Sequence, residues 1–170
     1  MASTASGVRN VLFLCRINGG RSIMAEALLN HRAGGRYRAY SAGVEPGPAI
    51  PQPVLNLLAR HGVPTGGLYP KSWKTFSGPK APKLDFVITT CDRSAGESCP
   101  VWPGQPVRAH WSIDDPSTGQ ADPAERMARL EACYQHISRS IDLFLTMPEI
   151  AIDRIALGNR IDEIGAQTAA

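Results

Sequence analysis

The sequence lacks several features that mark membrane, secreted and nucleic-acid-binding proteins. No stretch approaches the roughly 20 apolar residues that a helix needs to cross a bilayer, and the N-terminal segment has no apolar core of a signal peptide. Basic residues are scattered, and the formal net charge is only +3 over 170 residues. We therefore expect a cytoplasmic protein that binds neither membranes nor nucleic acids.

Cysteine is also scarce, with four residues in the chain. Because cytoplasmic thiols are kept reduced, we expect these cysteines to be free, reactive or metal-binding rather than bridged. The histidines do not follow the spacing of metal ligands, and Cys91 and Cys99 lack the further clustered ligands of a zinc site. The sequence therefore predicts no metal centre.

Length and composition favour one compact domain. Hydrophobic residues make up 43% of the chain and charged residues 19%, which is ordinary for a globular protein with a sizeable core. We divide the chain into a flexible tail over residues 1–9, a catalytic domain over 10–147, and a C-terminal helical extension and tail over 148–170.

Apolar runs and helical periodicities alternate along the chain. Short apolar runs predict strands at residues 11–14, 37–42, 84–89 and 107–111. Helical patterns predict helices at residues 22–32, 51–60, 123–147 and 150–164, with a shorter one at 72–76. This alternation is typical of an α/β fold. We expect a four-stranded parallel sheet in a three-layer αβα arrangement, with an extra C-terminal helix.

The loop after the first predicted strand carries the strongest chemical signal. Cys15 and Arg21 stand at its ends in a Cys-x5-Arg spacing, and a predicted helix begins directly behind it. Helix N–H groups and an arginine fork bind a tetrahedral oxyanion, and the same field favours a nucleophilic thiolate. The expected oxyanion-binding residues are Arg16, Ile17, Asn18, Gly19, Gly20, Arg21 and Ser22, and Ser22 can also hydrogen-bond to the sulfur.

Two other types of loop can join a strand to a helix at this position. A Walker A loop is excluded because Gly-Lys-Ser/Thr is missing. A buried cysteine at a strand end, beside an ordinary glycine turn, remains open on the motif alone.

An acid is needed to protonate the oxygen that departs when a thiolate attacks an oxyanion. Asp114 and Asp115 follow the last predicted strand, and Pro116 restrains the backbone of the residue before it. Because the carboxyl ends of parallel strands share one edge of a sheet, Asp115, Cys15 and Cys91 are expected to converge there. Taken alone, Asp-Asp-Pro is also typical of a solvated turn.

The remaining cysteines differ in their surroundings. Cys91 and Cys99 flank one loop, at a spacing too long for a Cys-x-x-Cys redox pair, and by themselves they can be incidental. Cys133 falls on the apolar stripe of the long predicted helix, so we expect it in the core.

Taken together, these motifs resemble those of the arsenate reductases built on the low-molecular-weight tyrosine phosphatase fold. The resemblance runs from about Asn10 to Met147. It comprises Val-Leu-Phe-Leu-Cys with Cys-x5-Arg-Ser, Met24-Ala25-Glu26, Tyr40-Ser41-Ala42-Gly43, Cys91-Asp92 to Cys99-Pro100, and His110-Trp111 before Asp115-Pro116.

The resemblance implies an enzyme of arsenic detoxification. Cys15 would attack arsenate held by Arg21, with Asp115 as the acid. Cys91 would then displace arsenite and form a disulfide with Cys15, and Cys99 would move that redox-active disulfide to an exposed Cys91–Cys99 pair. The implied reductant is an external thiol carrier, thioredoxin or glutaredoxin with glutathione, and no tightly bound cofactor is expected. Residual phosphatase activity is compatible with the same groups.

The loop departs from the family's usual Cys-Thr-Gly-Asn at Arg16 and Ile17. Ile17 replaces a glycine, and a β-branched residue tolerates positive φ poorly, so we expect the oxyanion cradle to be altered or weakened. Arg16 either adds positive charge at the mouth of the loop or projects into solvent.

Two alternative functions stay open at this point. Cys15, Arg21 and Asp115 suffice for a low-molecular-weight phosphatase acting on phosphotyrosine or a small phosphoester, although such enzymes carry aromatics where this chain has Ser117 and Thr118. A non-catalytic oxyanion-binding module is the second alternative. The apolar residues of the last predicted helix would then serve a partner, whereas packing on the chain's own surface or in a homodimer is the simpler interpretation.

Overall fold

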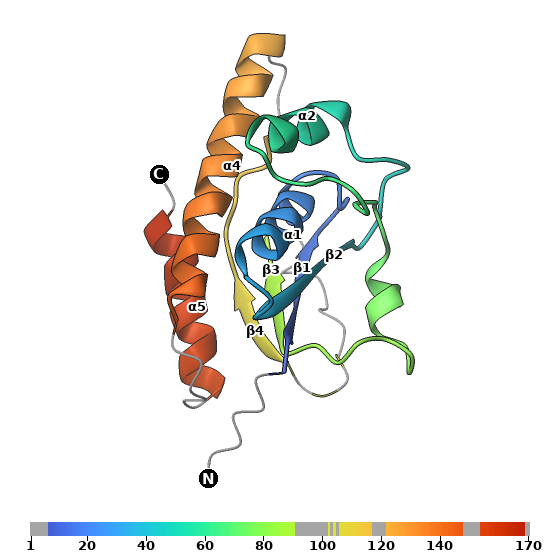
Figure 1. The fold of residues 1–170 in the computed structure, drawn as a ribbon, viewed down its shortest axis with the longest axis vertical. Helices are drawn as coiled ribbons and strands as arrows, with labels where there is room; N and C mark the ends of the chain where they lie inside the picture. The colour runs from blue at the N-terminus through green and yellow to red at the C-terminus, as the bar shows by residue number, and fades with distance from the viewer. Residues whose placement is uncertain are drawn as a thin grey trace.

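The computed structural model describes residues 7–90, 102, 104, 106–116, 122–147 and 154–168. Strands and helices alternate along the chain (Figure 1). In order they are β1 (Arg9–Cys15), α1 (Arg21–Arg32), β2 (Tyr37–Gly43), α2 (Gln52–Arg60), the 3-10 helix η1 (Trp73–Phe76), β3 (Phe86–Thr89), β4 (Val107–His110), α4 (Pro123–Leu145) and α5 (Arg154–Thr168).

The strands form one sheet in the order β2-β1-β3-β4, and every neighbouring pair is parallel. The chain winds outward from β1 to β2 and then, by way of β3, to β4 on the other side. The order therefore reverses between β1 and β3, and a ligand crevice forms at such a reversal, beyond the carboxyl ends of the strands. Cys15 is the last residue of β1, so it lies at this position.

The larger hydrophobic core lies on one face of the sheet. Val11 and Phe13 of β1 point into it, together with apolar residues of α1, α2, α4 and α5. The apolar stripe of α4 contributes Leu130, Cys133 and Ile137. Side chains alternate in direction along a strand, so β1 supplies every second residue to this core.

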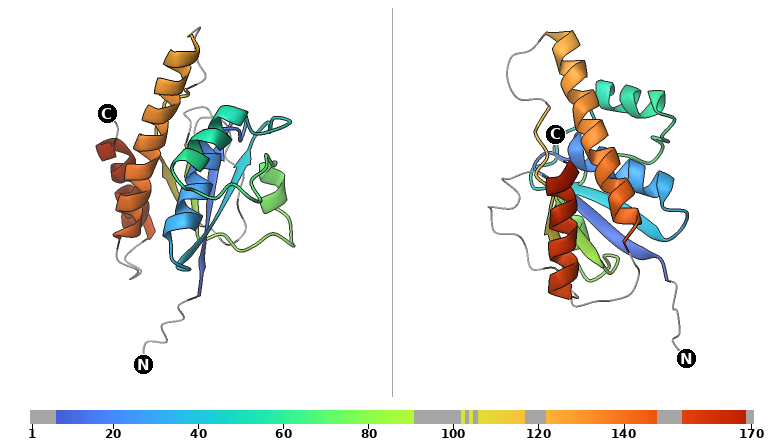
Figure 2. Two further views of the ribbon diagram at one scale, coloured as in Figure 1. Left: turned by 45° about the horizontal axis from the view of Figure 1, so that its top comes forward. Right: turned by 90° about the vertical axis from the view of Figure 1, so that its left-hand side faces the viewer.

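The opposite face carries a smaller core. Leu12 and Leu14 of β1 pack there with Phe76 of η1 and with the fully buried Trp102. Figure 2 shows η1 across the sheet from α4 and α5. The short helix expected at 72–76 is present as η1, and it packs inward, since Phe76 is buried and Trp73 packs against the same cluster.

The last helix, α5, packs beside α4 and against β4 (Figure 2). The α/β fold, the four-stranded parallel sheet and the extra C-terminal helix are thus confirmed. The helix ends later than predicted, at Thr168 instead of 164, because Gly165 does not break it but contacts the ring of Trp111. In the described part of the chain, none of the helices is long and apolar enough to cross a membrane.

Candidate active site

The predicted Cys-x5-Arg loop joins the end of β1 to the start of α1. Cys15 is 3% exposed, and the side chain of Asn18 is fully buried behind it. Gly20 caps α1 and brings no side-chain acceptor to the first helical turn. The N–H groups of that turn are consequently not engaged by a capping side chain, and they are the groups that bind an anion at a helix N-terminus.

The sulfur of Cys15 takes part in a hydrogen-bond network with Asn18 and Ser22. The Asn18 N–H donates to Cys15 Sγ at 3.1 Å, and Ser22 Oγ lies 2.8 Å from the sulfur. Asn18 Nδ2 donates to Ser22 Oγ at 2.9 Å. Because the Ser22 oxygen accepts from Asn18, its own hydrogen is free to point at the sulfur. A thiolate can only accept, so in that state both Asn18 N–H and the Ser22 hydroxyl donate to the sulfur and stabilise its negative charge.

The backbone of the loop corrects the expectation about Ile17. Among the non-glycine residues described, the only one with positive φ is Asn18, at 56°. Asparagine tolerates this region better than other residues with a Cβ, because its short polar side chain can hydrogen-bond locally. Ile17 has negative φ, so the predicted backbone strain at that position is wrong.

The first part of the loop is held by the chain that follows β2. The carbonyls of Arg16 and Ile17 accept hydrogen bonds from Glu45 and Gly47 at 2.8 and 3.0 Å. Arg16 also forms an exposed ion pair with Glu45 at 3.3 Å. The side chain of Ile17 is 50% exposed, so the side chains of these two residues lie on the outside of the loop, and only their backbone N–H groups can face an anion.

Gly43, the last residue of β2, allows this close approach. A Cβ at Gly43 would lie 2.8 Å from the Arg16 carbonyl oxygen and 3.0 Å from both the N and the Cβ of Asn18. These contacts are with backbone or with a rigidly placed side chain, so neither can yield without moving the loop. The absence of a side chain at Gly43 is therefore part of the loop's geometry.

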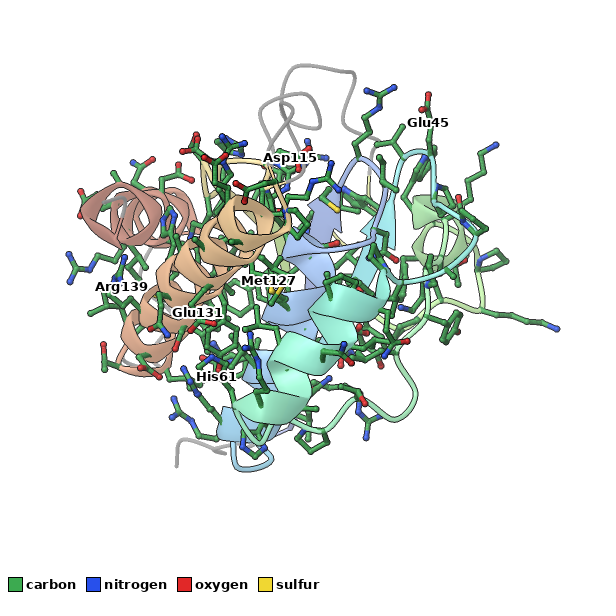
Figure 3. All side chains as sticks on the ribbon, turned by 90° about the horizontal axis from the view of Figure 1, so that it is seen from above. Glu45, His61, Asp115, Met127, Glu131 and Arg139 are labelled. Carbon is green, nitrogen blue, oxygen red and sulfur yellow. The ribbon has the colours of Figure 1, made fainter. Side chains whose placement is uncertain are left out.

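The structure brings Asp115 to the loop, as the strand order led us to expect. Arg21 Nη2 lies 3.5 Å from Asp115 Oδ2, and Nη1 donates to the Ile113 carbonyl at 3.0 Å. The Asp115 side chain is 34% exposed, so its carboxylate is accessible from solvent beside Arg21. Figure 3 shows Asp115 and Glu45 at the same edge of the molecule. Arg21 has further N–H donors that these contacts leave for an oxyanion.

Cys91 and Cys99, the other two predicted site cysteines, lie outside the described residues. The residues on either side of their segment are fixed. Thr90 donates to the Leu14 carbonyl from both its N–H, at 2.7 Å, and its hydroxyl, at 2.8 Å. Trp102 is 1% exposed in the smaller core. Cys91 thus directly follows Thr90, which is hydrogen-bonded to Leu14, the residue before Cys15.

Cys133 is buried, as predicted from its position on α4. Burial is the main cause that raises the pKa of its thiol to about 12, with the nearby Arg21 charge opposing this. It therefore stays protonated at neutral pH and is a poor nucleophile. Within the described ranges, no three His, Cys, Asp or Glu side chains gather in a group that could hold a metal ion.

Sequence reasoning missed a buried ion pair behind the loop. Glu26 of α1 lies 3.6 Å from Lys71 Nζ, with both side chains less than a tenth exposed, and the Ser41 hydroxyl donates to Glu26 at 3.0 Å. Burial raises the pKa of Glu26 and lowers that of Lys71, against the attraction between the two charges. The backbone N–H of Lys71 donates to Asn18 Oδ1 at 2.8 Å, which links the pair to the loop.

Removing one member of this pair should weaken the fold strongly. We expect Lys71→Met to lower the free energy of unfolding by about 3 kcal/mol, because Glu26 is left buried without its partner charge. Urea unfolding measures the change. The double variant Glu26→Gln, Lys71→Met should recover most of the loss. A double variant as unstable as Lys71→Met would show that the lysine acts through packing and not through charge.

Known proteins that carry the same type of fold are similar to this chain in sequence. Residues 10–155 match the family described as low molecular weight phosphotyrosine protein phosphatase. An arsenate reductase of Halalkalibacterium halodurans is 29% identical over 134 residues, which cover 79% of this chain and 93% of that protein.

Two solved structures of arsenate reductases are also similar to this chain. The thioredoxin-dependent arsenate reductase of Corynebacterium glutamicum is 31% identical with a TM-score of 0.54, over 83% of this chain and 65% of that one, so this chain spans just under two thirds of it. An arsenate reductase of Archaeoglobus fulgidus is 29% identical with a TM-score of 0.58, over 78% and 98%. Since the family match covers most of the chain, the protein belongs to the low molecular weight phosphotyrosine protein phosphatase family.

Proposed function

We propose that this chain is an enzyme that reduces arsenate to arsenite, with Cys15 as the nucleophile. The observation that carries the proposal is the convergence of Asn18 N–H and Ser22 Oγ on Cys15 Sγ at hydrogen-bond distance, beside the Arg21–Asp115 pair. The relatives described above carry the name arsenate reductase, which supports this choice of substrate.

The first step is attack of the Cys15 thiolate on the arsenic atom. One arsenate oxygen leaves as water, with a proton supplied by Asp115, and a sulfur–arsenic bond forms. Arg21 and the N–H groups of the residues from Arg16 to Ser22 hold the remaining oxygens. In this step Cys15 acts as a covalent nucleophile and Asp115 as the general acid for the leaving oxygen.

The second step is reduction. The Cys91 thiolate attacks Cys15 sulfur, a Cys15–Cys91 disulfide forms, and the electron pair of the sulfur–arsenic bond stays with arsenic, which leaves as arsenite. Cys99 then attacks Cys91 and releases the Cys15 thiolate, so the disulfide moves to Cys91–Cys99. The fixed position of Thr90 against Leu14 supports this relay, because Cys91 follows Thr90 directly.

An external thiol carrier completes the cycle by reducing the Cys91–Cys99 disulfide. The name of the Corynebacterium relative favours thioredoxin, and glutaredoxin with glutathione is the alternative. We propose a cytoplasmic location, where such carriers keep thiols reduced. No tightly bound cofactor is required by these steps.

Phosphoester hydrolysis is the second candidate function. The groups that a phosphocysteine route requires are a nucleophile, a phosphate-binding arginine and an acid. Cys15, Arg21 and Asp115 supply them within the described residues. That route has no use for Cys91 and Cys99, whereas the reductase route uses both. A non-catalytic oxyanion-binding module is disfavoured by the donors on Cys15 and by an acid placed at the loop.

Serine variants of the two relay cysteines separate these functions. We expect Cys91→Ser and Cys99→Ser to abolish multiple-turnover arsenate reduction, because no disulfide can then be passed to the carrier, while p-nitrophenyl phosphate hydrolysis persists. The measurement is arsenite release with thioredoxin, thioredoxin reductase and NADPH. Cys133→Ala is the matched control and should retain reduction. Sustained turnover in both serine variants would overturn the relay, and hydrolysis alone in the wild type would make the protein a phosphatase.

A further inference from the structure

The helix α5 lies almost wholly beyond the part of the chain that matches the family, which ends at residue 155. We propose that α5 is a positioning element for the acid loop, holding Asp115 at the Cys15 loop through Trp111 and His110. This inference rests on the proposed role of Asp115 as the acid. In this role α5 does more than cover the sheet, because it also places the acid.

The first contact between α5 and the acid loop is at Trp111. Its side chain is fully buried, and its indole Nε1 donates to the Ile161 carbonyl at 2.9 Å. Gly165, one turn further along α5, sits against the same residue. A Cβ at Gly165 would lie 2.7 Å from Trp111 Cδ1 and 3.1 Å from Trp111 Cα. The helix can approach the tryptophan this closely only because position 165 carries no side chain.

The second contact is at His110, the last residue of β4. In the sheet, the N–H groups of Val107 and Trp111 bond toward β3. The His110 N–H points the other way, where it donates to Asp162 Oδ1 at 2.6 Å. On its other side, His110 Nδ1 lies 2.6 Å from Thr89 Oγ1. The end of β4 is therefore held between β3 and α5.

The acid loop begins at this fixed point. Two residues after Trp111, the Ile113 carbonyl accepts a hydrogen bond from Arg21, and two residues further on Asp115 pairs with Arg21. Only three residues separate Trp111 from Asp115. A shift of Trp111 therefore changes the point from which this short loop reaches Arg21, and we expect the position of Asp115 to change with it. A misplaced acid lowers the rate even when its chemistry is intact.

Gly165→Ala tests the inference, because it pushes α5 against Trp111 without touching the site. The readout is kcat/KM for phenyl phosphate and for p-nitrophenyl phosphate in the full-length protein. Phenolate is a poor leaving group and needs the acid, whereas p-nitrophenolate leaves with little help. We expect a loss of about tenfold or more for phenyl phosphate and a clearly smaller loss for p-nitrophenyl phosphate. The Cys15 alkylation rate should stay near that of the wild type.

Gly158→Ala is the matched control. A Cβ there would lie 2.9 Å from the Arg108 carbonyl oxygen, so it disturbs the same helix against the same strand, but away from the acid loop. It should lower the melting temperature without selecting between the two esters. Asp162→Ala is a milder second variant, in case Gly165→Ala fails to fold, and it should show the same selectivity as Gly165→Ala.

Asp115→Asn provides the reference for loss of the acid. If Asp115→Asn is selective against phenyl phosphate but neither Gly165→Ala nor Asp162→Ala is, α5 is only a structural support and the inference is wrong. The inference would also be wrong if Gly165→Ala and Gly158→Ala showed the same selective loss of kcat/KM for phenyl phosphate relative to p-nitrophenyl phosphate. If Asp115→Asn shows no selectivity between the esters, the proposed role of Asp115 as the acid fails, and the inference fails with it.

Discussion

Replacing Cys15 by serine is expected to abolish both arsenate reduction and aryl phosphate hydrolysis, by a factor of about 10⁴ or more. A serine hydroxyl does not ionise at neutral pH, so the donors of Asn18 and Ser22 have no sulfur anion to stabilise. Arsenite release and p-nitrophenol release measure the two activities.

The anion site itself should survive this change, because its N–H groups and Arg21 are untouched. Calorimetric titration with inorganic phosphate is therefore expected to give an affinity within about threefold of the wild type. Cys133→Ala, which removes the other described cysteine, serves as the control and should keep both activities. Turnover by Cys15→Ser within tenfold of the wild type would mean that the nucleophile has been misassigned.

The second large effect is expected at Gly43. Gly43→Ala places a methyl group 2.8 Å from the Arg16 carbonyl oxygen, so the loop from Cys15 to Asn18 must shift. Because the donors on the sulfur and the anion cradle depend on that geometry, we expect kcat/KM to fall by about 100-fold. Overpacking of this kind also lowers the free energy of unfolding by about 1–3 kcal/mol.

Gly66→Ala is the matched control for this experiment, since a Cβ at Gly66 has no atom within 4 Å. Kinetics with p-nitrophenyl phosphate and urea unfolding, run on both variants, separate the local effect from a general effect of adding a methyl group. An active Gly43→Ala variant with unchanged phosphate affinity would show that the loop is more adaptable than the close contacts indicate.

Most of the fold could be predicted because its signals are local. The apolar run before Cys15 and the helical spacing after Ser22 both follow from the preference of buried residues for one face of an element. Parallel order then follows from the alternation of strands and helices, and it places Cys15 and Asp115 at one edge. The structure does bring Arg21 and Asp115 together at the Cys15 loop, whereas the catalytic roles of these residues stay predictions.

The errors and omissions concern contacts between distant segments. An asparagine in the loop is a local signal for positive φ, and Asn18 takes it instead of Ile17. The bond from the Lys71 N–H to the Asn18 side-chain oxygen comes from a distant segment, so the sequence does not reveal it. Lys71 stands in a connection rich in proline and glycine, where no periodicity marks a buried residue. Its pairing with Glu26 spans 45 positions along the chain (71 − 26), so only the folded structure reveals it.

The bond between His110 and Asp162 has a further consequence for the behaviour of the protein in solution. The strand β4 lies at the outer edge of the sheet, and an uncovered edge offers its free N–H and C=O groups to a strand of another molecule. By occupying the outward N–H of His110 and crowding Arg108 with Gly158, α5 blocks that side. Its detachment would open the sheet to intermolecular strand pairing, so aggregation should begin with the loosening of this helix, before the sheet itself unfolds.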